Sequence, residues 1–476
     1  MNKKTVSIIL ALILLSQTTN CFSFPKVKPG VKVAPIDTPQ LWAEQNVFVT
    51  KNDPIIKWWE QFNDPLLTKY ITEAAVLNYD VQIATNRILI ERATRAGVKS
   101  TLYPQVDASA KYSRYDLFAS KIDVEKFNTS NEAINTFNTG FDASWEMDFF
   151  GKKRWDVVSA SEKIAMATEN KRNVLVSLTA EIARNYMELR GNQSELIVLN
   201  KNIDVQTRNL KMMKAKQKIG LASDAEVVNV QTLLDSLKAQ KPLIEGDIKS
   251  NIYNISVLTG RNPEILLEEL TPQKPLPAPP NFVATGIPAD LILQRADIRK
   301  AQRNLAASIA SVGAAKADLY PSIKINGAFG FENINLGNLG NIRGGLWSVS
   351  PAVNWKVFDR RILKANLDVK KAQAKEADLA LRQTVLNAVK DVETSINYFE
   401  KSKQTEKEVQ NAMLSSKKAY EFANTSYQIG LKSQYETLEL EKAYINNQSQ
   451  FVKSQTQTNL RIISLYKSLG GGWQAF

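Results

Sequence analysis

Residues 175–213 read LVSLTAEIARNYMELRGNQSELIVLNKNIDVQTRNLKMM, and this stretch decides the fold. An apolar residue returns at every seventh position, at Leu175, Ile182, Leu189, Leu196, Ile203 and Leu210. A second stripe three residues further on holds Leu178, Leu199 and Met213, with Asn185, Asn192 and Gln206 at its other places. A heptad pattern of this length is typical of helices that wrap around each other in a left-handed coiled coil. Because no proline occurs between residues 152 and 240, we predict one helix over 152–218, roughly 100 Å long at ~1.5 Å per residue.

The same pattern occurs a second time, about 210 residues later. The matching positions are Val385, Val392, Phe399, Glu406, Met413 and Tyr420, of which all but one are apolar. The flanking motifs repeat as well: Leu102-Tyr103-Pro104 returns as Leu319-Tyr320-Pro321, and Ile219-Gly220-Leu221 returns as Ile429-Gly430-Leu431. A period this long is too large for a solenoid repeat, so the chain is predicted to consist of two homologous halves.

The composition excludes several kinds of site. The chain has 61 Lys and Arg against 48 Asp and Glu, one cysteine and no histidine. The lack of histidine removes the commonest metal ligand and acid–base catalyst, and one cysteine cannot form an internal disulfide. With no phosphate-binding glycine loop and no metal-ligand cluster, we expect no catalytic, cofactor-binding or metal site and no enzyme activity.

The N-terminus has the layout of a secretory signal peptide, predicted over residues 1–23. Lys3 and Lys4 precede an apolar run of about ten residues, which is too short to span a bilayer. A secreted chain is not expected to bind nucleic acid, despite its basic balance. Cys21 is a candidate for lipid attachment, but Thr18-Thr19-Asn20 departs from the triplet that lipoprotein processing prefers. Cleavage after Ser23, with an unmodified Cys21, is the alternative.

The segments expected after the signal peptide follow the duplication. Each half is expected to run helix, strand pair, long helix, tip turn, helix. Ser223 and Ser433 are positioned to cap the helices after the tips, and Gly220 and Gly430 to end the helices before them. Residues 24–63 are predicted to be irregular. The first half covers 64–270, with a helix over 64–100, strands within 104–148 and helices over 152–218 and 225–259. A proline-rich linker over 271–287 leads to the second half, 288–470, which begins with a helix and has strands within 321–358 and helices over 360–428 and 435–469, before a tail over 471–476.

The predicted strands alternate between apolar and polar residues. Val106, Ala108, Ala110 and Tyr112 alternate with polar neighbours, as do Phe137 to Met147, Ile323 to Phe331 and Trp347 to Val357. Strands of about ten residues with one apolar and one polar side suit a membrane barrel with a wet interior. A soluble, half-buried hairpin shows the same alternation, but aromatic residues near the strand ends favour the membrane. Pro351 weakens the last strand because it has no N–H to donate. Since the smallest known barrels use eight strands, four strands per chain imply a barrel shared between several chains.

The motifs, in this order and on a duplicated frame, resemble the TolC-type outer-membrane factor family, on the efflux branch that includes OprM and NodT. The resemblance covers residues 53–471. It is carried by Trp58-Trp59 with Asp64-Pro65, the two Tyr-Pro strand entries, Arg295-x-Asp297-Ile298-Arg299, Trp355-x-x-Phe358-Asp359 and the two Ile-Gly-Leu tips. One departure is Ala296, where the family usually has proline.

This resemblance implies a homotrimer in the outer membrane of a Gram-negative cell. Three copies would form a twelve-stranded β-barrel embedded in outer-membrane lipid, above a periplasmic tunnel of long coiled-coil helices. The fold class is therefore mainly α with a membrane β-barrel. The implied partners are a periplasmic adaptor (membrane fusion) protein and an inner-membrane pump of the RND or ABC class.

The favoured function is a passive channel-tunnel that exports drugs or other toxic small molecules as part of a tripartite efflux system. Two alternatives remain open at this point. One is a type I secretion duct for polypeptides, and the other is a periplasmic structural coiled coil without transport activity. The four alternating segments argue against the structural coiled coil, which has no use for them.

The resemblance also implies a gate at the tips. In the family, a tyrosine and a basic residue near the second tip engage an acid near the first tip, and these positions hold Tyr427, Lys432 and Glu226. Acids that form a ring in relatives correspond to Glu436 and Glu439. Lysine lacks the planar fork of arginine, so we expect looser links here than in relatives with arginine. Exposed ion pairs of a hairpin surface, each contributing about 0–1 kcal/mol, are the alternative interpretation.

Overall fold

The computed structural model describes residues 42–43, 49–50, 55–115, 134–280, 283–285, 294–341 and 344–476. The predicted signal peptide with Cys21 and Ser23 lies outside the described residues, as does most of the predicted irregular segment 24–63. Those predictions therefore stay predictions.

Within the described residues the chain is mostly helical, with a few strands. Up to residue 270, the elements are β1 Val49–Thr50, the 3₁₀ helix η2 Trp58–Phe62, α2 Pro65–Leu77, α3 Tyr79–Ser100, β2 Gln105–Tyr115, β3 Ile134–Met147, α5 Lys152–Lys218, α6 Asp224–Thr259 and α7 Pro263–Leu270. The rest contains β4 Val283–Ala284, α9 Ala296–Ala317, β5 Ser322–Asn333, η4 Leu336–Asn338, β6 Gly345–Asn354, α10 Arg360–Gln428, α11 Gln434–Leu469 and η6 Trp473–Ala475.

The chain divides into two compact units. Of the described residues, the sheet unit comprises those within 89–165 and 302–379, and the hairpin unit comprises those within 35–88, 166–301 and 380–476. Helices α3, α5, α9 and α10 each contribute residues to both units.

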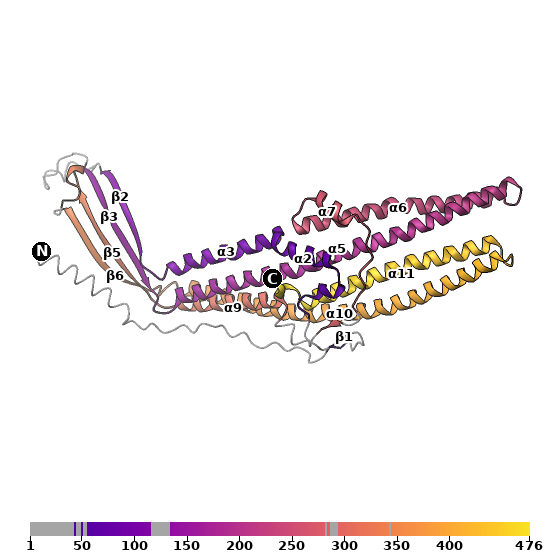
Figure 1. Ribbon diagram of the computed structural model, residues 1–476. Helices are drawn as coiled ribbons and strands as arrows, with labels where there is room; N and C mark the ends of the chain where they lie inside the picture. The colour runs from indigo at the N-terminus through magenta and orange to yellow at the C-terminus, as the bar shows by residue number, and fades with distance from the viewer. Residues whose placement is uncertain are drawn as a thin grey trace, which may run out of the picture. The chain divides into compact units, whose positions relative to one another are not determined.

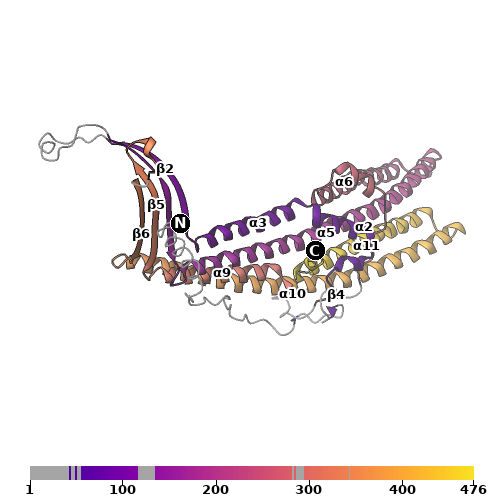
Figure 2. The same cartoon turned by 60° about the vertical axis from the view of Figure 1, so that its left-hand side comes forward.

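The sheet unit contains one four-stranded antiparallel sheet, with the order β2-β3-β5-β6 (Figures 1 and 2). Each half of the sequence supplies one β-hairpin, and the two β-hairpins pair with each other through β3 and β5. The register places Phe141 opposite both Ala108 on β2 and Phe329 on β5, and Phe329 opposite Trp347 on β6. Because side chains alternate across a strand, these four residues share one face of the sheet.

The helices of the sheet unit pack closely where α5 and α9 meet. Ser159 Oγ on α5 donates to the carbonyl oxygen of Ala307 on α9 at 3.1 Å. At the foot of the strands, the rings of Phe150 and Tyr320 stack with their centroids 4.8 Å apart. Lys152 on α5 forms an ion pair with Asp318 just after α9. The two halves of the sequence are thus joined through their helices as well as through the sheet.

The hairpin unit buries the predicted heptad stripes. Leu175, Ile182 and Leu189 on α5 are at most 4% exposed, and Val385, Val392 and Phe399 on α10 are at most 3% exposed. Near the first tip, Leu210 and Met213 on α5 pack with Val227 and Leu234 on α6. Further from the tip, Val198 and Val205 on α5 pack with Ile445 on α11. The helix α5 therefore contacts α6 with one face and α11 with another, and the apolar stripes that the sequence predicts are buried between helices.

Two tryptophans anchor the middle of the hairpin unit. Trp58 and Trp59 are each 1% exposed. Trp58 stacks on Tyr466 of α11, and Trp59 stacks on Phe476, with ring centroids 5.0 and 5.8 Å apart. Residues from both halves of the sequence thus share one aromatic core, as expected for tryptophans in this role.

The predicted single helix over 64–100 is wrong, because the structure breaks it at Asn78 into α2 and α3. Asn78 Oδ1 accepts hydrogen bonds from the backbone nitrogens of Asp80 and Val81, so it caps the start of α3. Its Nδ2 donates to the carbonyl oxygen of Leu258 on α6 at 2.9 Å. The contact with Leu258 and the cap together favour a break in the helix at Asn78, which helix propensity alone does not predict.

Three smaller features also differ from the sequence prediction. Trp58 and Trp59 lie in a short 3₁₀ helix before α2, within the segment 24–63 that was predicted to be irregular. The strand β6 ends at Asn354, so Trp355 and Val357, which the predicted alternation included, lie beyond the strand. The short helix α7, begun by Pro263 after the cap Asn262, and the parallel pair of β1 with β4 were not predicted.

Candidate functional site

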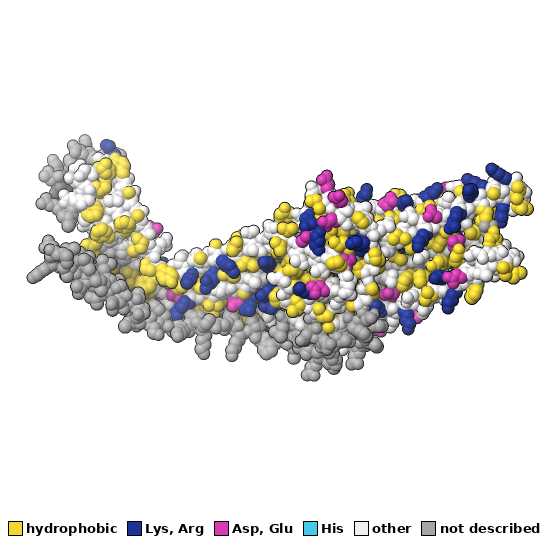
Figure 3. Space-filling view, viewed as in Figure 1, with side chains coloured by type: hydrophobic (Ala, Val, Ile, Leu, Met, Phe, Trp, Pro, Cys, Tyr) yellow, Lys and Arg dark blue, Asp and Glu magenta, His cyan; other side chains and the backbone are white. Residues whose placement is uncertain are grey.

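The sheet has two chemically different faces. One face carries Val106, Phe141, Phe329, Trp347 and Val353, all of them more than half exposed. In Figure 3, hydrophobic side chains gather over the strands of the sheet unit. An exposed apolar surface of this kind marks a site of contact with a membrane or with another protein.

The opposite face of the sheet is polar. The register brings Asp107 opposite Asp142, and Gln105 opposite Ser144. Lys111 lies opposite Asn138, which in turn lies opposite Glu332. The alternation predicted from the sequence is therefore an alternation between an apolar and a polar face. Within the described residues, β2 and β6 have no second strand partner, so both edges of the sheet are open.

The two tips have almost the same backbone geometry. Gly220 ends α5 with φ = 74°, and Gly430 ends α10 with φ = 77°, in the left-handed region that only glycine adopts readily. The next residues close each helix, since Leu221 N donates to Lys216 O and Leu431 N donates to Ser426 O, both at 2.9 Å. The prediction that these glycines end the long helices is confirmed.

A capping box starts the helix after each tip. Ser223 Oγ accepts from the backbone nitrogen of Glu226, and the Glu226 carboxylate accepts from the backbone nitrogen of Ser223. Ser433 and Glu436 repeat the arrangement at the second tip. The predicted caps at Ser223 and Ser433 are confirmed. The Ser-x-x-Glu spacing in the sequence could also have identified Glu226 and Glu436 as the other halves of these boxes.

The five candidate gate residues all lie at the tips of the hairpin unit. Among the described residues, Glu226 has no hydrogen bond or ion pair with Tyr427 or Lys432. Tyr427 is 39% exposed, and Glu439 lies 3.9 Å from Lys442 Nζ. Hydrogen bonds from Ser223 lower the pKa of Glu226, with the backbone donor as the main cause. Those from Ser433, chiefly its side chain, lower the pKa of Glu436. Both carboxylates are therefore ionised acceptors at neutral pH.

A buried arginine that sequence reasoning missed lies in the middle of the hairpin unit. Arg190 on α5 is fully buried. Its Nη1 donates to Gln193 Oε1 at 2.7 Å and to the carbonyl oxygen of Pro272 at 3.2 Å, and the guanidinium lies over the ring of Tyr186. Its Nε and Nη2 have no partner among the described residues. This arginine fastens the start of the proline-rich linker to α5.

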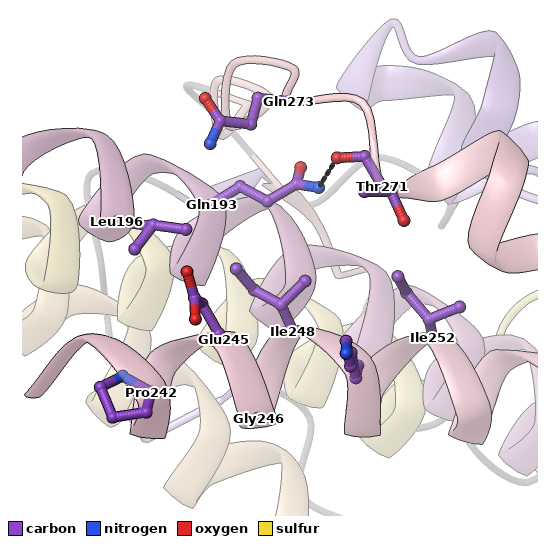
Figure 4. A pocket seen from close by; sticks show the side chains of 10 residues that line it. Gln193, Leu196, Pro242, Glu245, Gly246, Ile248, Ile252, Thr271 and Gln273 are labelled. Atoms are coloured by element: carbon purple, nitrogen blue, oxygen red, sulfur yellow. Dashed lines mark hydrogen bonds between the residues drawn. The ribbon is translucent and has the colours of Figure 1, made fainter. Parts of the chain in front are cut away.

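A cavity adjoins Gln193, the hydrogen-bond partner of Arg190. It has a volume of about 490 Å³ and lies between α5, α6 and the linker (Figure 4). Gln193 donates to the carbonyl oxygens of Leu270 and Thr271, at 2.8 and 3.4 Å. Pro242 and Gly246 on α6 also line the cavity. Leu196, Ile248 and Ile252 supply the apolar part of its lining.

Two searches of the described residues bear on other kinds of site. No described helix is both long and apolar enough to cross a membrane. No group of three or more metal-ligating side chains occurs among the residues that the structure describes.

The comparisons with known proteins agree on one family. The sequence model of the outer membrane efflux protein family matches residues 70–261 and 287–471. The chain is 26% identical over 449 residues to nodulation protein T of Rhizobium leguminosarum, and the alignment covers 94% of each chain. It is 26% identical over 426 residues to the toluene efflux pump outer membrane protein TtgF of Pseudomonas putida, covering 88% of this chain and 86% of that protein.

A solved structure supports the same conclusion. The outer-membrane channel OprN superposes with a TM-score of 0.84 at 26% identity, over 94% of this chain and 99% of that one. The outer membrane channel CmeC of Campylobacter jejuni, at 20% identity, shares the fold with a TM-score of 0.84. The chain therefore belongs to the outer membrane efflux protein family, and it is a protein of the outer membrane with a periplasmic helical tunnel.

Proposed function

We propose that this chain is the passive outer-membrane channel-tunnel of a tripartite efflux system, which releases drugs or other toxic small molecules outside the cell. The observation that carries the proposal is the sheet, which has an apolar face, a polar face and two open edges. In a bilayer every backbone polar group needs a partner, so a sheet with open edges cannot stand there alone.

Three copies would remove the open edges. If β6 of one copy pairs with β2 of the next, three chains form a closed barrel of twelve strands, with the apolar faces toward lipid and the polar faces lining the channel. The exposed apolar residues of the outer helices support this assembly. Ile83 and Ile90 on α3 and Ile362 and Leu386 on α10 are about half exposed or more, as expected of helix faces that a second copy covers.

The partners follow from what the chain lacks and from its relatives. The sequence has no nucleotide-binding motif, so the energy for export would come from another protein. Relatives such as TtgF are named as outer membrane proteins of efflux pumps. We therefore propose a periplasmic adaptor and an inner-membrane RND or ABC pump as partners, with the tips as the end that faces them.

The gate is proposed to lie at these tips. Tyr427 and Lys432 would engage Glu226 of a neighbouring hairpin, and Glu436 with Glu439 would form a ring of six carboxylates in the trimer. The capping box uses Glu226 Oε2, while its Oε1 has no partner among the described residues. A second interaction of the same carboxylate is thus compatible with its role as a cap.

Three measurements test the proposed function. Native mass spectrometry in detergent should give three times the mass of one mature chain, and the same preparation should conduct ions in a planar lipid bilayer. Host cells that lack the chain should accumulate more ethidium than wild-type cells. A folded monomer without conductance contradicts the channel, whereas a conducting trimer whose loss leaves ethidium accumulation unchanged contradicts the efflux role alone.

A further inference from the structure

A second cavity of the hairpin unit has a strongly basic lining. It has a volume of about 450 Å³ and lies between α5, α10 and α11. Four cations line it, namely Arg295, Lys390, Arg461 and Lys467, against one carboxylate, Asp391. None of these residues belongs to the proposed gate.

Three of the four cations have carboxylate partners. Arg295 Nη2 lies 2.6 Å from Asp297 Oδ2, and its Nη1 donates to the carbonyl oxygen of Ser468. Lys467 pairs with Glu181 at 3.2 Å, and Lys390 pairs with Asp391 at 3.2 Å. These pairs leave the lining with one uncompensated positive charge.

That charge belongs to Arg461. Its guanidinium lies over the ring of Tyr398, 4.5 Å from the centroid. When the Gln457 amide is oriented to satisfy both groups, its oxygen accepts from Arg461 Nε and Nη2 at 3.0 and 3.1 Å. Arg461 has no ion pair within the described part of the chain, and its Nη1 has no hydrogen-bond partner there. The ring and the amide hold the guanidinium in place without neutralising it.

The rest of the lining supplies neutral hydrogen-bonding groups. Ser177 on α5, Thr394 and Ser395 on α10 and Ser464 on α11 contribute hydroxyl groups. Each hydroxyl group has an O–H that can donate a hydrogen bond to an anion. A fixed guanidinium with free N–H groups binds planar oxyanions, carboxylates in particular, through charge-assisted hydrogen bonds.

We propose that this cavity binds a small organic anion, a carboxylate-bearing solute, whose carboxylate occupies the position left unpaired beside Arg461. Lys390, with a side chain that is 68% exposed, provides a second cation at the entrance. The hydroxyl groups on three helices receive the remaining polar groups of the solute. This site does not depend on conductance, but in a working channel it would hold anionic cargo weakly enough to release it.

Citrate is a suitable probe, and glycerol is the neutral control. Saturation-transfer NMR and titration on the purified full-length protein in detergent, at constant ionic strength, should detect citrate binding and no glycerol binding. Arg461→Gln removes the uncompensated charge and should weaken citrate binding about tenfold, the equivalent of about 1.4 kcal/mol. Arg461→Lys keeps the charge without the planar fork and should weaken it less.

Arg92→Gln is the matched control, because Arg92 is an exposed arginine on α3 without an ion pair in the described residues. It should bind citrate as the wild type does. Lys390→Gln changes an exposed side chain and should weaken citrate binding several-fold. This variant tests the site if Arg461→Gln does not fold. Absence of citrate binding to the wild type overturns the site. Citrate binding by Arg461→Gln or Lys390→Gln that equals binding by the wild type also overturns it. An equal loss of citrate binding in Arg92→Gln overturns it as well, because it would indicate a general effect of charge.

Discussion

Glu226 accepts hydrogen bonds from both the backbone nitrogen and the Oγ of Ser223, at 2.7 and 3.0 Å. One residue pair therefore caps the helix that follows the first tip, and Ser433 with Glu436 caps the helix after the second tip in the same way. A carboxylate proposed for the gate is thus also a helix cap. Any test of the gate at Glu226 or Glu436 has to separate these two roles.

The first prediction concerns the pH dependence of the tips. The pKa of Glu226 in the folded protein lies below its ordinary value of 4.5 because Ser223 donates to its carboxylate. A lowered pKa means that the cap stabilises the tip above pH 4.5 and that this stabilisation is lost as the pH falls through the folded value. Amide hydrogen exchange of residues 219–230, corrected for intrinsic rates, should therefore accelerate below pH 4.5. In Ser223→Ala this acid-dependent step should be smaller, and an unchanged step would contradict the cap as its cause.

The second prediction concerns the links between hairpins. Tyr427→Phe together with Lys432→Ala removes the hydroxyl and the cation proposed to engage Glu226 of a neighbouring hairpin. The double variant should spend more time open and show a higher mean conductance in a planar bilayer. Lys417→Ala, at an exposed lysine of α10 that pairs with Glu421, is the control and should conduct as the wild type does. Equal conductance of the double variant and the wild type would rule out these links.

The third prediction concerns the proposed carboxylate ring. Glu436→Gln with Glu439→Gln removes the charges but preserves the capping box, which accepts glutamine in place of glutamate. We expect lower cation selectivity and weaker block by multivalent cations, because the ring would no longer attract them. Reversal potentials across a salt gradient measure the selectivity. Glu408→Gln, an exposed acid on α10, serves as the control. If the double variant and this control keep the same cation selectivity, the ring is not part of the conduction path.

The fourth prediction concerns the buried Arg190. Arg190→Met preserves much of the volume but leaves Gln193 Oε1 and the Pro272 carbonyl without their donor. A buried acceptor without a partner costs about 1–3 kcal/mol. Hydrogen exchange in residues 263–273 should therefore accelerate by roughly tenfold or more. Arg92→Met, at the exposed arginine of α3, should leave that segment unchanged. If Arg190→Met also leaves it unchanged, Arg190 does not hold the linker.

Local sequence patterns were sufficient to predict the long helices and their tips. The heptad stripe from Leu175 to Leu210 and the Gly220 break depend on periodicity and on the backbone freedom of glycine, which neighbouring residues encode. The apolar and polar sides of the strands followed from their alternation in the same way, because side chains point to opposite faces along a strand. The shared barrel and the gate stay proposals, because both require neighbouring copies.

Features that depend on distant residues could not be predicted. Asn78 ends α2 partly because Leu258, 180 residues later, accepts from its side chain. The attachment of the linker to α5 depends on the hydrogen bond from Arg190 to the carbonyl oxygen of Pro272. The basic cavity depends on Arg461 lying beside Tyr398. No local spacing encodes these contacts, because each requires knowing which helices are neighbours.

The last prediction compares two helical glycines of the sheet unit. A Cβ added to Gly313 on α9 would lie 2.6 Å from Cδ2 of Trp155 on α5, whereas one added to Gly97 on α3 would have no atom within 4 Å. Gly313→Ala must therefore displace the indole or separate α5 from α9, which should cost about 1–3 kcal/mol. Gly97→Ala should instead stabilise the helix by about 0.5–1 kcal/mol, because alanine loses less backbone freedom on folding.

The two substitutions add the same methyl group, so the opposite signs isolate the contact with Trp155. Thermal unfolding of the detergent-solubilised protein, followed by circular dichroism at one protein concentration, should give a lower midpoint for Gly313→Ala and an equal or higher midpoint for Gly97→Ala. Gly313→Ala combined with Trp155→Phe should recover part of the loss, since the smaller ring leaves room for the methyl group. Equal midpoints for the two single variants would show that close approach of α5 and α9 does not determine the stability of this unit.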